Sequence, residues 1–283
     1  MAAPVAVVTD STAYLPDDMV AAHGVAVVPL QVGVGGKTFD EGRGRTAAEA
    51  TRGFRDWKPV TTSRPSPERF AVAYREAAET GASGVVSVHL SAEMSGTVES
   101  ARTAAKDAPI RVRVVDSRSI GMGLGFSVLS AARSAMAGRD LDAVADAAVR
   151  RIRATRSLFY VDTLEHLRRG GRIGAAATLL GSALMIKPLL RITDGRIAPL
   201  EKVRTSSRAL ARLEELAVEL AGDRHVDVAV QHVADPARAA ALAAHLRERV
   251  AHLHDLHVGE VGPVIGAHVG PGMLGVVVSR REA

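Results

Sequence analysis

The stretch "GVVSVHLSAEMSGTVESA", residues 84–101, joins an apolar run directly to a helical pattern. The run, residues 84–90, is almost continuously apolar, which is typical of a strand buried on both faces of a parallel sheet. Ser95, Gly96 and Thr97 follow where the helix would begin, and residues of these types favour helix N-termini. Because the first N–H groups of a helix have no acceptors within it, the junction predicts either a capping serine or a site for an anion.

Further apolar runs of the same form occur in the first half of the chain. They are "VAVVTD" at 5–10, "VAVVPL" at 25–30 and "IRVRVVDS" at 110–117. Helical patterns lie between and after them, with a start at Ser66-Pro67-Glu68 and an apolar stripe over 141–152. Strands that alternate with helices in this way predict an α/β layer fold with a parallel sheet.

The second half of the chain has a different character. Asp194-Gly195 stands between two apolar-rich segments and predicts a hairpin, which parallel strands cannot form. A helix over 206–221 and several later strands complete a second unit. We therefore predict two closely packed domains, an N-terminal domain of residues 1–157 with a parallel sheet and a smaller C-terminal domain of residues 158–283 with a mixed sheet.

Composition excludes several classes of site. The chain has 283 residues, 24% of them charged, and no cysteine. Disulfides, zinc-thiolate centres and cysteine nucleophiles are excluded, and a cytoplasmic location is predicted. The formal charge of +5 raises a nucleic-acid hypothesis, but aromatic residues make up only 3%. Because stacking platforms for bases are therefore scarce, we interpret the charge as an arginine-rich surface.

Three segments partly resemble nucleotide-binding or metal-binding motifs, but their residue spacing does not match. "GGKT" at 35–38 lacks the earlier glycine of a phosphate-binding loop and predicts a turn, and "GMGLGF" at 121–126 lacks the third glycine of a dinucleotide fingerprint. "HLHDLH" at 252–257 matches no metal-ligand spacing. We predict no nucleotide site and no metal site.

Polar residues follow the predicted strands at 10–12, 91–97 and 116–117, where ligands of doubly wound sheets bind. Thr62 and Ser95 offer short hydroxyl donors, and Gly96 lets a ligand approach the backbone. This set favours a small anionic group, a carboxylate or a phosphate. Ordinary helix capping accounts for the same residues equally well.

The chain resembles the DegV family of fatty-acid-binding proteins, which act as the lipid-binding subunit of bacterial fatty acid kinase. The resemblance covers nearly the whole chain. The motifs that carry it are "VTDSTAYLP" (8–16), "TTSRPSP" (61–67), "LSAEMSGTVESA" (90–101), "VVDSRSIGMGLG" (114–125), "DTLEHLRRGGRIG" (162–174), "IKPLLRITDGRI" (186–197) and "AHVGPGMLG" (267–275).

The resemblance implies a two-domain α/β protein with a three-layer, parallel-sheet N-terminal domain. It implies a buried tunnel at the domain junction that holds a long-chain fatty acid. The head-group carboxylate would be held by Thr62, Ser95 with Gly96, and His268. Arg172 resembles a head-group or docking arginine.

Arg204 resembles a basic residue that helps a partner kinase engage. In the family an ATP-dependent, dihydroxyacetone-kinase-like subunit phosphorylates the bound fatty acid for phospholipid metabolism. The resemblance therefore implies a carrier with no catalytic residue and no cofactor, which contacts the membrane transiently. Arg64 stands where the family commonly has glutamine, which changes the charge at the mouth, and Met185 replaces a frequent asparagine.

Two alternatives remain open on the sequence. Ser95, His268 and either Asp116 or Asp10 can be arranged as a hydrolytic triad acting on a lipid ester. The positive net charge is the basis for the second alternative, a nucleic-acid-binding regulator.

Overall fold

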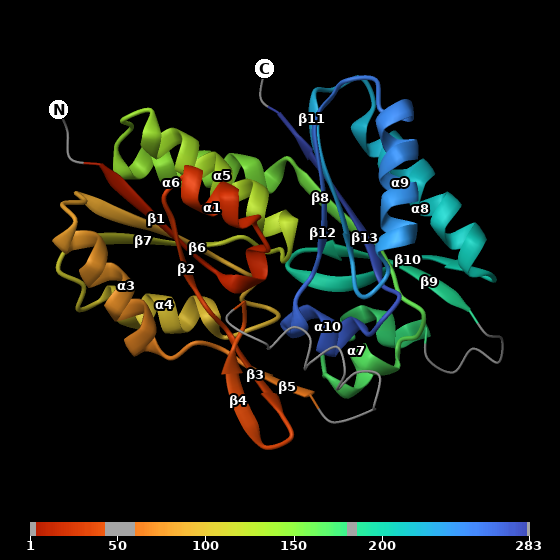
Figure 1. Ribbon diagram of the computed structural model, residues 1–283, viewed down its shortest axis with the longest axis horizontal. Coiled ribbons are helices and arrows are strands. Elements are labelled where there is room, and N and C mark those ends of the chain that lie inside the picture. Colours follow the sequence, from red (N-terminus) through yellow and green to blue (C-terminus); the bar gives the residue numbers. More distant parts are fainter. Residues whose placement is uncertain (1–3, 43–59, 180–185, 282–283) are drawn as a thin grey trace.

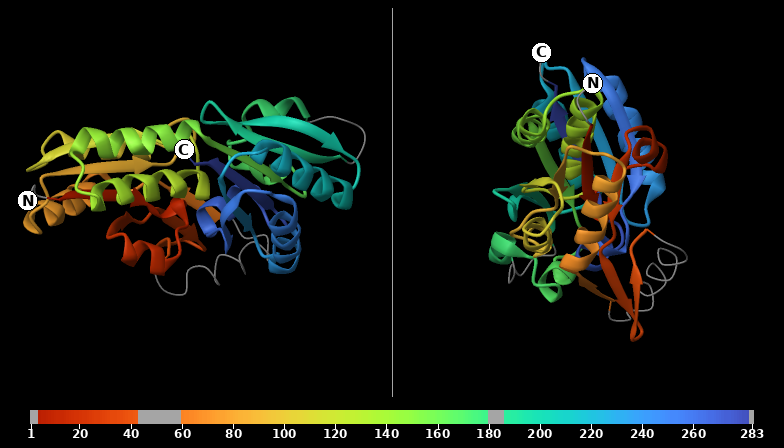
Figure 2. Two further views of the ribbon diagram at one scale, coloured as in Figure 1. Left: turned by 90° about the horizontal axis from the view of Figure 1, so that it is seen from above. Right: turned by 90° about the vertical axis from the view of Figure 1, so that its left-hand side faces the viewer.

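The computed structural model describes residues 4–42, 60–179 and 186–281, so Met185 lies outside the described residues. Two lobes lie side by side along the long axis of the molecule (Figures 1 and 2). The first lobe is built on a parallel sheet of order β2-β1-β6-β7. Its strands are β1 (Val5–Asp10), β2 (Val25–Val28), β6 (Gly84–His89) and β7 (Arg111–Asp116).

Helices cover both faces of this sheet (Figure 1). Neighbouring strand residues point to opposite faces: Val85 packs with Phe70 on one side, and Val86 packs with Leu124 on the other. The predicted α/β fold with a parallel sheet is confirmed, and it has three layers. The covering helices are α3 (Pro67–Glu79) and α4 (Thr97–Ala105) on one face, with α5 (Met122–Met136) and α6 (Leu141–Arg153) on the other.

The second lobe contains a mixed sheet of order β10-β9-β8-β13-β11-β12, in which β11 and β12 are parallel. Asp194 and Gly195 both have positive φ and form the predicted hairpin turn between β9 and β10. Helices α8 (Ser206–Ala221) and α9 (Pro236–Arg249) pack on this sheet. The strands are β8 (Thr155–Tyr160), β9 (Lys187–Thr193), β10 (Arg196–Val203), β11 (Val226–His232), β12 (Leu253–Glu260) and β13 (Leu274–Arg280).

The division after residue 157 falls inside β8 and stays a prediction. Helix α5 packs on the second sheet as well as on the first, because Met122 and Phe126 contact Ala229 and Val277. The two lobes therefore share part of one apolar core.

A small antiparallel sheet of order β4-β3-β5 projects at the junction and is not predicted by the sequence pattern. It consists of β3 (Gln31–Val34), β4 (Lys37–Asp40) and β5 (Val60–Ser63). Gly35 and Gly36, both at positive φ, form the turn predicted for "GGKT". Short helices α7 (Glu165–Arg169) and α10 (Pro263–Val269) lie near this sheet (Figure 1).

Among the described residues, no helix combines the length and the apolar character that crossing a bilayer requires.

Candidate ligand-binding cavity

A cavity of about 130 Å³ lies between the two lobes. Its walls are mostly apolar and come from both lobes. The first lobe contributes Leu30, Leu90 and Ile120. The second lobe contributes Phe159, Leu167, Ile192, Ile197, Val261, Val264, Ile265, Val269, Met273 and Val277.

Four of the predicted site residues line this cavity: Thr62, Ser95, Arg172 and His268. They come from β5, the loop before α4, the segment after α7, and α10. Arg204 does not line the cavity; it is exposed just beyond the end of β10.

Gly96 is the N-cap of α4, and among the described residues no side chain accepts a hydrogen bond from the first N–H groups of this helix. Ser95 lies one residue earlier, with its Oγ 2.9 Å from Thr97 Oγ1. The capping role that sequence alone allowed for Ser95 is therefore wrong. Ser95, directly before this helix start, lines the cavity, and helix N-termini without a side-chain acceptor suit an anion.

His268 and Thr62 form a hydrogen bond across the lobes, with His268 Nε2 3.0 Å from Thr62 Oγ1. His268 Nδ1 is buried and has no hydrogen-bond partner among the described residues. Because a buried unpaired N–H is more costly than an unpaired acceptor, we infer that the proton is on Nε2 and that Nε2 donates to Thr62. The hydroxyl proton of Thr62 is then free to donate to a ligand.

Burial, together with the positive charge of Arg172, lowers the pKa of His268 to about 4. The imidazole is therefore neutral near pH 7. In this geometry the neutral imidazole can orient the Thr62 hydroxyl but supplies no charge.

Two guanidinium groups stand at the cavity on either side of the same loop. Arg64 Nη1 donates to the carbonyl of Gly96 at 3.4 Å, and Arg172 Nε donates to the carbonyl of Met94 at 3.3 Å. Within the described parts of the chain, neither arginine forms an ion pair. Both side chains are exposed, so their charge is available to an incoming anion.

The hydrolytic triad is not assembled. His268 Nδ1 has no orienting carboxylate among the described residues, and Asp116 accepts from the backbone N–H groups of Ala92 and Arg118. Asp10 instead lies 3.1 Å from His89, and both side chains are fully buried. A base without its orienting acid lacks the geometry that activates a serine.

Sequence reasoning missed Glu41, a carboxylate with only 3% of its surface exposed. Its Oε2 accepts from Ser11 Oγ at 2.6 Å, and its Oε1 accepts from Tyr14 OH at 2.6 Å and from Val264 N at 2.8 Å. Val264 belongs to the first turn of α10, so Glu41 of the first lobe caps the helix that carries His268. No local pattern reveals a cap that lies 223 positions away.

Burial raises the pKa of Glu41 above its usual value of 4.5, and its hydrogen bonds oppose this only in part. The Glu41 carboxyl group therefore holds its proton more tightly in the folded protein than in the unfolded chain. The stability that this protonation contributes is fully present below the unfolded pKa and is lost as pH rises through the folded pKa. We expect the melting temperature of the parent to exceed that of Glu41→Gln most at about pH 4, and the difference to shrink towards about pH 8.

Thermal unfolding of both proteins across this pH range measures the effect, with Glu99→Gln, at an exposed position on α4, as the control. A difference that is constant, or that grows with pH, would contradict the assignment.

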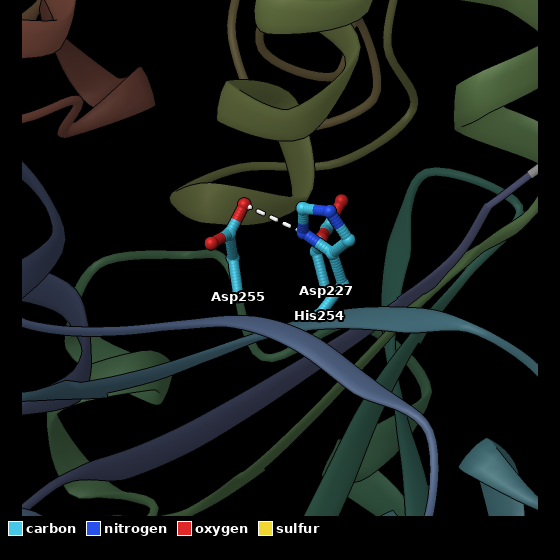
Figure 3. Close-up of side chains that lie close together, drawn as sticks. All are labelled: Asp227, His254 and Asp255. Carbon is cyan, nitrogen blue, oxygen red and sulfur yellow. Dashed lines mark ion pairs between the residues drawn. The ribbon is translucent and has the colours of Figure 1, made fainter.

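Asp227, His254 and Asp255 form a cluster whose ligand atoms lie within 4.8 Å of one another (Figure 3). However, Arg151 and Arg281 both form ion pairs with Asp227, and Arg281 Nη2 also lies 3.5 Å from Asp255. Because two guanidinium groups already neutralise these carboxylates, we assign no metal to the cluster.

The fold and the cavity together define a two-lobed α/β protein that encloses an apolar chamber with hydroxyl and guanidinium groups at one side. Comparison with known proteins gives the family. A family model described as "Uncharacterised protein, DegV family" matches residues 4–281. The chain belongs to the DegV family.

A DegV domain-containing protein of Streptomyces coelicolor is 57% identical over 281 residues, which cover 99% of this chain and 100% of that protein. A fatty-acid-binding DegV family protein of Thermus thermophilus has a solved structure with a TM-score of 0.93 and 36% identity, covering 98% of this chain and 100% of its own. DegV of Bacillus subtilis, also a fatty-acid-binding protein, gives a TM-score of 0.91 at 32% identity, covering 99% and 100%.

Proposed function

We propose that this protein binds a long-chain fatty acid, with the acyl tail in the cavity and the carboxylate at Thr62, Ser95 and Arg172. The observation that supports this most directly is an apolar chamber that ends in hydroxyl donors and a guanidinium group. Fatty-acid binding by DegV proteins of similar fold supports it further.

The energetics indicate which part of the site decides binding. Burying a methylene is worth about 0.8 kcal/mol, so a tail of about sixteen carbons gains on the order of 10 kcal/mol relative to water. A bilayer provides nearly the same gain, so transfer of the tail from membrane to cavity is close to neutral. The head-group contacts must then favour the protein, and hydrogen bonds to a charged group contribute roughly 1.5–3 kcal/mol each.

The polar side of the cavity, formed by Thr62, Ser95 and Arg172, suits a carboxylate, which only accepts hydrogen bonds. The hydroxyls of Thr62 and Ser95 and the first N–H groups of α4 are donors, and Arg172 adds charge. His268 contributes by fixing the direction of the Thr62 hydroxyl.

The same proposal includes a kinase partner. The protein presents the carboxylate to an ATP-dependent, dihydroxyacetone-kinase-like subunit and then holds the acyl-phosphate, so phosphoryl transfer takes place in the partner. The lack of a nucleotide motif in the sequence supports this division of labour, and the guanidinium groups of Arg64 and Arg172 suit a dianionic product. We place the protein in the cytoplasm, with transient membrane contact for loading, in keeping with its lack of cysteine.

Lipid extracted from the purified protein and identified by mass spectrometry tests the ligand directly. We expect a long-chain fatty acid at near-stoichiometric amount. Absence of such a lipid, together with no displacement of a fluorescent fatty acid, would overturn the proposal.

Ser95→Ala and His268→Ala should each weaken fatty-acid binding while leaving the melting temperature nearly unchanged. Ser95→Ala removes a donor to the carboxylate, and His268→Ala frees Thr62 to turn away. Fluorescent fatty-acid displacement measures both, and unchanged affinity in both variants would reject the head-group site.

Arg204→Ala should leave fatty-acid affinity unchanged and slow phosphorylation by the partner kinase severalfold, because Arg204 is exposed and does not line the cavity. Arg139→Ala, at an exposed position of the first lobe, is the matched control. Equal phosphorylation rates for Arg204→Ala and the parent would remove the docking role.

The geometry gives no support to the lipid-ester hydrolase, since the triad is not assembled. The nucleic-acid regulator is an untested alternative, and retention on DNA that falls with salt concentration would be its signature.

A further inference from the structure

Two further polar residues line the cavity, separate from the head-group residues. Gln231 on β11 and Ser157 on β8 line it beside Gly121, which precedes α5. Both side chains are more than nine-tenths buried, with 6% and 8% of their surface exposed. Hydrogen bonds join neither of them to Thr62, Ser95 or His268.

The sheet places these two side chains on one surface. Gln231 is paired with Gly275, and Gly275 is paired with Phe159 on the other side, while Ser157 is paired with Val277. Phe159, Gly275 and Val277 also line the cavity. Because residues two apart on a strand share a face, Gln231 and Ser157 belong to the same wall, among the apolar side chains that would surround the acyl tail.

The orientation of the Gln231 amide is fixed. Its Oε1 accepts from the backbone N–H of Met122 at 2.9 Å, and only the oxygen of an amide can accept this bond. The Nε2 end, with two N–H donors, has no hydrogen-bond partner among the described residues, and Gln231 is one of the residues that line the cavity. Ser157 Oγ has a long contact, 3.4 Å, with Ser119 Oγ.

A plain hydrocarbon tail at this wall would cover amide donors without pairing them, which is unfavourable. An oxygen atom on the tail would accept from them. Resting on the proposed fatty-acid binding, we propose that the preferred ligands are acyl chains that bear a hydroxyl group, which accepts a hydrogen bond from Gln231 Nε2.

The test compares hexadecanoic acid with its monohydroxylated isomers, each with the hydroxyl at a different carbon, by displacement of a fluorescent fatty acid. We expect the parent to bind at least one isomer about tenfold more tightly than hexadecanoic acid, the factor that one hydrogen bond of about 1.4 kcal/mol gives. Gln231→Leu should abolish this preference.

The preference is the ratio of two affinities measured on the same protein sample. If part of the Gln231→Leu protein does not fold, both affinities fall equally and the ratio is unchanged. If the parent binds hexadecanoic acid as tightly as every isomer, or if Gln231→Leu keeps the preference, the inference is wrong. If neither hexadecanoic acid nor its isomers bind, the proposed function itself fails.

Discussion

Thr62→Val is expected to weaken fatty-acid binding by about 10- to 100-fold, which corresponds to the loss of one hydrogen bond to a charged group. Valine has nearly the shape of threonine and suits a strand, so β5 should be preserved. The substitution removes the Thr62 hydroxyl, which accepts a hydrogen bond from His268 and donates one to the carboxylate. Isothermal titration or fluorescent displacement with a saturated fatty acid measures the change.

Thr61→Val is the matched control for this substitution. Thr61 lies on the same strand, is exposed, and does not line the cavity. Adjacent strand residues face opposite sides, so the control changes the strand equally without touching the site. Equal affinities for the two variants would show that Thr62 does not contact the carboxylate.

Gly170→Ala is expected to weaken binding by about tenfold or more without a large loss of stability, because it displaces His268 and with it the donor direction of Thr62. A Cβ added at Gly170 would lie 2.1 Å from His268 Nδ1, too close for both to keep their places. The backbone of Gly170 is right-handed helical, with φ of −74°, so alanine is otherwise acceptable there.

Gly259→Ala is the control for Gly170→Ala, since a Cβ at Gly259 meets nothing within 4 Å and the backbone φ is not positive. Fatty-acid displacement and thermal unfolding are measured on both variants. Full affinity in Gly170→Ala would mean that His268 can move without consequence, and its role in orienting Thr62 would be disproved.

Much of the fold was predictable because apolar runs of the right length mark buried strands. The runs at 5–10, 84–90 and 110–117 became β1, β6 and β7, and the hairpin at Asp194 was recognised from turn chemistry alone. The small β3–β5 sheet was missed because its strands have four residues each and carry little periodic signal.

The site was predictable only in part. Resemblance pointed to Thr62, Ser95 and His268, and the structure gathers all three around one cavity. Glu41 and Gln231 were missed for a different reason. A cap contributed by the other lobe and an amide near the end of a buried strand leave no trace in local spacing, because tertiary contacts alone give them their positions.

The contact of Glu41 with α10 has a consequence for how this protein can change over generations. Glu41 of the first lobe caps α10 of the second, and Gln231 of the second lobe accepts from the first N–H of α5 in the first lobe. Neither lobe is therefore a self-sufficient module. A recombination event that replaced one lobe with that of a distant homologue would leave the buried Glu41 carboxylate without its partner and the first N–H groups of α10 without an acceptor. We therefore expect the two lobes to have been inherited together, with exchange confined to sequences that keep both ends of this contact.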